Sequence, residues 1–135
     1  MSTALMRSFA SRGDCEVLDE PFYASYLQRT GVDHPLREKI VKSQDCDPDL
    51  VADFCANGPI KMKIQYQKQM CHHLIRNDKK GFLKYLNNAF LIRHPILVVN
   101  SFEKKHSSFC FEDLGFQQQF EIFDEVSNFL GHPPP

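Results

Sequence analysis

The residues best suited to chemistry in this chain are an arginine and a serine eight positions apart, Arg93 and Ser101. Arg93 follows the apolar run 89–92, which predicts a buried strand. Pro95 then favours the first turn of a helix, because its fixed φ is helical and its missing N–H needs no partner there. Ser101 lies about two turns into that helix. Ligands of open α/β sheets bind at the carboxyl ends of parallel strands, and a guanidinium with a hydroxyl there suits a phosphate monoester.

The elements that must position this pair are predicted from hydrophobic periodicity and from helix start and stop signals. Two further strands are predicted, at 15–19 and at 60–66. In the second of them, apolar residues alternate strictly. Helical segments are predicted at 3–11, 22–27, after His34-Pro35, after Asp47-Pro48, and at 70–75, 79–86, 95–105 and 114–129. Because strands alternate with helices, the fold class is α/β with a parallel sheet.

Size and composition are those of one ordinary soluble domain. The chain has 135 residues, 42% hydrophobic and 24% charged, with a formal net charge of −1. That charge supplies no broad attraction for nucleic acid or an anionic membrane, and no apolar run reaches the roughly 20 residues that cross a bilayer. The five cysteines are scattered and odd in number. This spacing fits reduced thiols and predicts a cytoplasmic protein.

Six short motifs occur in the order expected of a sulfotransferase-like P-loop family, in a bacterial-type branch. They are Ser2–Phe9, Asp19–Ala24, Tyr66–Met70, His72–Leu74, Phe90–Pro95 and Glu112–Gly115. The resemblance covers nearly the whole chain, so residues 1–135 are expected to form a single, partial domain of this type. It implies a three-layer P-loop fold, in which helices flank a parallel sheet.

The resemblance also implies an activity. Members of this family transfer a sulfuryl group from 3'-phosphoadenosine 5'-phosphosulfate (PAPS) to a hydroxyl or amine, here of a small-molecule acceptor. An arginine and a serine eight residues apart bind the 3'-phosphate of the donor in this family, and Arg93 with Ser101 has that spacing. The chemistry of the two side chains and the resemblance therefore point to the same pair.

The remainder of the family's donor site is a loop between the first strand and the first helix. Its backbone N–H groups and the helix N-terminus hold the 5'-phosphosulfate. Ser2 and Thr3 match the end of that motif, so the resemblance implies that they border the phosphosulfate; the alternative is that they fray at the terminus. We therefore expect a chain truncated at both ends, without the first strand and this loop, with impaired turnover and an exposed sheet edge able to self-associate.

Three residues are candidates for contact with the reacting groups. Glu20, at the end of the predicted strand 15–19, is either the base or a solvated carboxylate that caps the next turn. His72 is either the base or a packing histidine, and Lys68 either contacts a substrate or is simply solvated. The Cys71-His72-His73 run raises zinc, but ligands would have to be recruited from a polar loop, and no metal is predicted.

Two other functions compete with sulfuryl transfer. A non-catalytic binding or regulatory remnant of the same fold would keep the scaffold without turnover. A small-molecule kinase is a weaker alternative, because the chain contains no G-x-x-x-x-G-K-[ST] sequence.

Overall fold

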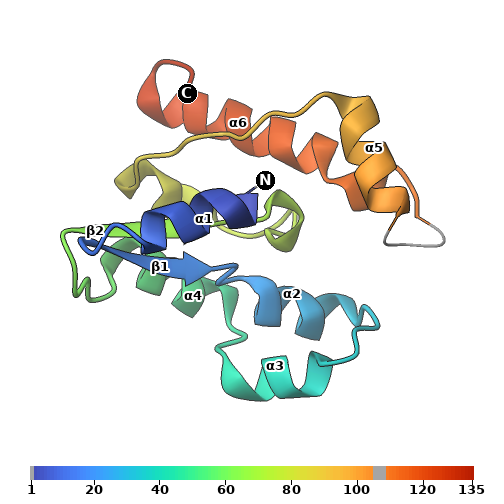
Figure 1. Cartoon of the computed structure of the whole chain (residues 1–135), viewed down its shortest axis with the longest axis horizontal. Coiled ribbons are helices and arrows are strands. Elements are labelled where there is room, and N and C mark those ends of the chain that lie inside the picture. Colours follow the sequence, from blue (N-terminus) through green and yellow to red (C-terminus); the bar gives the residue numbers. More distant parts are fainter. Residues whose placement is uncertain (1, 105–108) are drawn as a thin grey trace.

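The computed structural model describes residues 2–104 and 109–135, and in the first half of the chain three helices separate its two strands (Figure 1). In order they are α1 (Ser2–Ala10), β1 (Cys15–Asp19), α2 (Tyr23–Thr30), α3 (Arg37–Ser43), α4 (Pro48–Asn57), β2 (Ile64–Lys68), the 3₁₀ turns η1 (Cys71–His73) and η2 (Gly81–Tyr85), α5 (Pro95–Glu103), η3 (Glu112–Leu114) and α6 (Phe116–Leu130).

The two strands form a parallel pair in which Cys15 lies opposite Ile64 and Asp19 opposite Lys68. Helices α2, α3 and α4 make the crossover between them, as a parallel pair requires. Helix α1 packs on both strands, where the Phe9 ring stacks on Tyr66 with centroids 4.4 Å apart. Helices α1 and α4 lie on opposite sides of the strands in Figure 1. The described part of the chain therefore has a mixed α/β fold with a parallel pair.

The hydrophobic core lies between α4, the two 3₁₀ turns and α6. Phe22 and Val126 are each 1% exposed, and the Phe22 ring contacts Phe82 at a centroid distance of 5.5 Å. The other buried members of this cluster are Val51, Ala52, Cys55, Leu74, Leu83 and Ile122. The core thus joins the crossover to the C-terminal helix and holds both 3₁₀ turns in place after β2.

Strand predictions were right for one segment, shifted for a second and wrong for the third. The strand at 15–19 is confirmed, whereas the one predicted at 60–66 begins only at Ile64. The segment 89–92 is not a strand. Instead Phe90 N–H donates to Pro135 O at 2.7 Å, and Leu91 O accepts from the Gln119 side chain at 3.1 Å. A strand needs a neighbouring ladder, and no other strand of the described residues lies beside this run.

Helices were predicted more accurately, because their signals are local. Asp47 caps α4 by accepting from Asp49 N–H at 2.9 Å, and Pro48 occupies the first turn. The helix predicted at 79–86 is the shorter 3₁₀ turn η2, and the last helix begins after Gly115, whose φ of 70° ends η3. Within residues 2–104 and 109–135, no helix combines the length and apolar character that a bilayer span requires.

Candidate functional site

The polar centre of the structure lies where both strands end. Lys68 is the last residue of β2, and its Nζ donates to Asp19 Oδ1 at 2.9 Å and to Glu20 Oε1. The Lys68 side chain is only 7% exposed, while those of Asp19 and Glu20 are 53% and 25% exposed. The parallel register therefore brings one nearly buried ammonium between two carboxylates at the carboxyl edge of the sheet.

Glu20 is held at this edge by an unusual backbone conformation. Its φ is 49°, a positive value that a side chain with a Cβ rarely adopts. Two backbone hydrogen bonds keep it there, because Glu20 N–H donates to Lys68 O at 2.9 Å and Glu20 O accepts from Tyr23 N–H at 2.9 Å. Strained residues of this kind cluster at functional sites. Here the bend after β1 turns the carboxylate toward Lys68.

Lys68 carries its charge firmly at neutral pH. Burial lowers the pKa of Lys68, but its hydrogen bonds to Glu20 and Asp19, together with their negative charges, outweigh burial and raise the pKa above its ordinary value. The sequence left open whether Lys68 is solvated, and the structure shows that it is buried and paired.

Two histidines and two tyrosines pack in a stack beside this ion pair. The His73 ring lies 4.8 Å from Tyr23, 5.0 Å from Tyr26 and 4.4 Å from His72 between centroids. Burial, together with repulsion from His72 when that ring is protonated and from Lys68, lowers the pKa of His73 to about 3. Burial also lowers the pKa of His72, against the opposing charges of Glu20 and Asp113. Both imidazoles are therefore neutral at pH 7.

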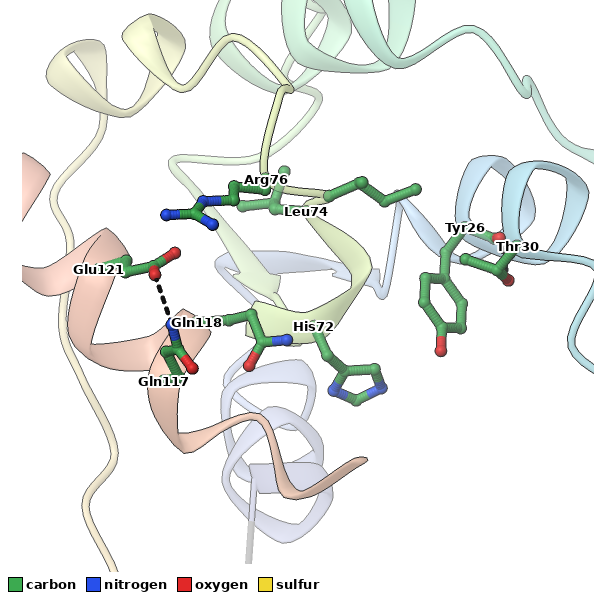
Figure 2. Close-up of a pocket in the computed structure, with 9 residues that line it drawn as sticks. Tyr26, Thr30, His72, Leu74, Arg76, Gln117, Gln118 and Glu121 are labelled. Carbon is green, nitrogen blue, oxygen red and sulfur yellow. Dashed lines mark hydrogen bonds between the residues drawn. The ribbon is translucent and has the colours of Figure 1, made fainter. Parts of the chain in front are cut away.

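His72 also forms part of the wall of a cavity of about 360 Å³ (Figure 2). Helix α2 contributes Tyr26 and Thr30 to it, and α6 contributes Gln117, Gln118 and Glu121. The segment after η1 adds Leu74, Ile75 and Arg76. The cavity therefore has aromatic and aliphatic surface together with groups of both charges.

The predicted site residues fall into three groups in the structure: those at the strand ends, those at α5 and those at the start of α1. Glu20 and Lys68 meet at the carboxyl edge of the strands, and His72 follows four residues after Lys68, in η1, where the Glu20 charge acts on it. Arg93 and Ser101 lie apart from them, both exposed, before and within α5. Neither side chain has a hydrogen-bond or ion-pair partner among the described residues.

Ser2 and Thr3 form the first turn of α1, whose N-terminus lies on the side toward which β1 points (Figure 1). That turn contains no acidic side chain. Its first N–H groups are free of intrahelical acceptors, as in every helix, and carry the positive end of the helix dipole. The placement suits an anion at the same edge of the sheet as Lys68.

Sequence reasoning missed most of the cavity. Tyr26 follows Tyr23 by three residues, a spacing that places both rings on one face of a helix. Arg76 follows η1 and belongs to no sequence motif. Glu121 lies in α6, which the sequence predicted only as a helix with an apolar stripe. Only the fold brings these residues to one cavity.

No cluster of three or more metal-ligating side chains occurs in the part of the chain that the structure describes. Burial raises the pKa of the Cys71 thiol to about 11. All five cysteines are free.

Known proteins resemble this chain along almost its whole length. Residues 1–131 match the sulfotransferase domain family. The chain is 36% identical over 134 residues to branched-chain-amino-acid aminotransferase-like protein 2 of Arabidopsis thaliana, and 34% identical to protein 1 of the same name. Each match covers 99% of this chain but 24% of the relative, so the chain spans about a quarter of their length. No solved structure matches. By the extent of the domain match, the chain belongs to the sulfotransferase domain family.

Proposed function

We propose that this chain binds PAPS and transfers its sulfuryl group to a hydroxyl or amine of a small-molecule acceptor. One observation carries the proposal: in a member of the sulfotransferase domain family, Glu20 pairs with Lys68 where the two parallel strands end, and His72 follows in η1. Crevices at that edge bind the ligands of open α/β sheets. The full three-layer P-loop arrangement belongs to the same proposal.

The donor would be held by two groups of residues. The first turn of α1, with Ser2 and Thr3, suits the 5'-phosphosulfate because free N–H groups and hydroxyls are anion ligands. Arg93 and Ser101 suit the 3'-phosphate, because both are exposed and neither is engaged by another described residue. The chemistry of this donor set fits a nucleotide with two anionic ends.

The geometry favours His72 over Glu20 as the base. His72 forms part of the cavity wall, and its imidazole is neutral and able to accept a proton at pH 7. Glu20 is not among the residues that line the cavity, and its Oε1 is occupied by the Lys68 ammonium. In transfer, the acceptor's oxygen or nitrogen bonds to sulfur as the acceptor's proton passes to His72. The bond from sulfur to the bridging phosphate oxygen breaks, and adenosine 3',5'-bisphosphate leaves.

Calorimetry with adenosine 3',5'-bisphosphate tests the donor site. We expect Arg93→Ala to weaken binding by about 1.5–3 kcal/mol, the range for a hydrogen bond to a charged group, and Ser101→Ala by less. Arg12→Ala is the matched control, because Arg12 is an exposed arginine that pairs with Asp14 in the turn before β1. Equal affinity of the wild-type and Arg93→Ala proteins removes the Arg93 assignment. A wild-type protein that does not bind the nucleotide overturns the proposed function.

A second candidate is a binding protein of the same fold without turnover. The tight engagement of Glu20 by Lys68 favours it, because that contact is a structural ion pair as it stands. Nucleotide binding without sulfuryl transfer to any hydroxyl or amine tested would decide for this function. In either case the five free thiols fit a reducing compartment, and we propose a cytoplasmic location.

A further inference from the structure

The cavity beside His72 contains two opposite charges that do not form an ion pair with each other. Arg76 and Glu121 both line it. Among the described residues, no carboxylate lies within ion-pair distance of the Arg76 guanidinium. Figure 2 shows the guanidinium extending from one wall toward α6, the helix that carries Glu121. A cavity with separated positive and negative groups is complementary to a ligand that has one charge of each sign.

Hydrogen-bond acceptors gather on the α6 side of this cavity. Glu121 Oε1 accepts from Gln117 Nε2 at 3.0 Å, which leaves its second oxygen for another donor. Gln118 lines the same wall, and its Oε1 is buried without a hydrogen-bond partner in the described structure. Buried polar atoms are nearly always paired, so an unpaired acceptor calls for an explanation. A ligand ammonium or hydroxyl in the cavity would supply a donor for the second Glu121 oxygen.

The remaining walls of the cavity would contact the apolar body and the reactive end of such a ligand. Tyr26, Leu74 and Ile75 provide aromatic and aliphatic surface. The Tyr26 ring meets His72 edge-on at a centroid distance of 5.6 Å. Gly115 lies behind His72, since a Cβ built there would be 3.6 Å from His72 Nδ1. The cavity volume of about 360 Å³ falls within the range of roughly 300–1,000 Å³ typical of small-molecule sites.

We propose that this cavity is the acceptor site and that the acceptor is a small aminocarboxylic acid with a reactive hydroxyl. Its carboxylate would bind Arg76 and its ammonium would bind Glu121. Its hydroxyl would lie next to His72. This inference rests on the proposed function for the role of His72, but the cavity's preference for a zwitterion stands on Arg76 and Glu121 alone.

Saturation-transfer NMR with three matched probes tests the preference in the absence of a donor. L-tyrosine has both charges and a hydroxyl, tyramine lacks the carboxylate, and phloretic acid lacks the ammonium. The wild-type protein should bind L-tyrosine about tenfold or more tightly than either analogue, the effect of losing one charge-assisted hydrogen bond. Failure of L-tyrosine to bind, or equal binding of all three probes, overturns the inference.

Two variants provide the cross-test. Arg76→Gln should weaken L-tyrosine and phloretic acid about tenfold while leaving tyramine unchanged, and Glu121→Gln should weaken L-tyrosine and tyramine but not phloretic acid. Arg12→Gln is the control for loss of one arginine, and circular dichroism confirms that each variant is folded. Variants that are folded but weaken all three probes equally contradict the assignment of charges.

The two ligands separate this inference from the proposed function. If adenosine 3',5'-bisphosphate binds but L-tyrosine does not, the aminocarboxylic acceptor is wrong and the donor site stands. If L-tyrosine binds with the expected dependence on both charges but the nucleotide does not, the cavity is a zwitterion site and sulfuryl transfer is wrong.

Discussion

Asp19 and Lys68 are paired twice, once through the backbone and once through their side chains. They are the last residues of β1 and β2 and lie opposite each other in the parallel register. Lys68 Nζ also lies 2.9 Å from Asp19 Oδ1. Because the Lys68 side chain is 7% exposed, this contact and the one to Glu20 place a charged group in a largely dry setting at the carboxyl edge of the sheet.

Replacing Lys68 by methionine should destabilise the fold by about 1.5–3 kcal/mol, since charge-assisted hydrogen bonds are lost and two carboxylates remain close together. Urea unfolding at pH 7 measures the loss. The raised pKa of Lys68 means that its contribution is complete below pH 10.5 and disappears as the pH rises through the folded-state value. Lys63→Met, at an exposed lysine before β2, is the control. Equal stability of the two variants would contradict a structural role for the pair.

His72 should matter to turnover and not to donor affinity. We expect His72→Gln to lower the rate of sulfuryl transfer from PAPS about 10²–10⁴-fold, the usual contribution of a general base. Calorimetric affinity for adenosine 3',5'-bisphosphate should stay unchanged, because the proposed function assigns His72 to the acceptor and not to the donor. Undiminished transfer by the variant would rule out His72, and a loss of both properties would mean that it holds the fold.

His73 should make the fold sensitive to mild acid. Its folded-state pKa of about 3 lies below the ordinary value of 6.5. Well above pH 6.5 the His73 imidazole is neutral in both the folded and the unfolded chain. As the pH falls below 6.5, it becomes protonated in the unfolded chain but stays neutral in the folded chain until about pH 3. Stability therefore decreases between pH 6.5 and about 3, by about 1–2 kcal/mol at pH 5.

The variant His73→Phe separates this effect from other acid effects. It retains a ring against Tyr23 and removes Nδ1, which has no hydrogen-bond partner in the described structure. Urea unfolding at pH 7.5 and pH 5 should show a smaller loss of stability for the variant than for the wild type. His132→Phe, an exposed site, should behave as the wild type. The same pH dependence in all three proteins would show that His73 is not the source.

The stacking of Phe9 on Tyr66 should be the contact that holds α1 against β2. A double-mutant cycle with Phe9→Leu and Tyr66→Leu is expected to give a coupling free energy of about 0.5–1.5 kcal/mol, the range for aromatic pairs. Thermal or urea unfolding of the four proteins provides the values. Additive single effects would indicate that α1 is held elsewhere, for example through the buried Met6 side chain.

Most helix positions could be predicted from the sequence, because a helix is defined by neighbours along the chain. Asp47-Pro48 marks the start of α4 through a cap and a preset φ, and both act within one turn. Glu20-Pro21 likewise ends β1 where expected. The resemblance identified the sulfotransferase family, which the domain match confirms.

The strand predicted at 89–92 is absent, because local sequence does not specify strand pairing. Its apolar run has the composition of a strand, yet its backbone groups bond instead to Pro135 and to the Gln119 side chain. Whether such a run becomes a strand depends on a partner ladder, which neighbouring residues in the sequence do not encode.

The sequence alone therefore determined the family, most helix positions and the residue types able to handle an anion. Only the tertiary structure decided that Lys68 is buried between two carboxylates and that His72 shares a cavity with Arg76 and Glu121. The physical reason is that pairing, burial and charge separation depend on distances through space. The chain sets those distances only after the crossover between β1 and β2 and the packing of α6 are complete.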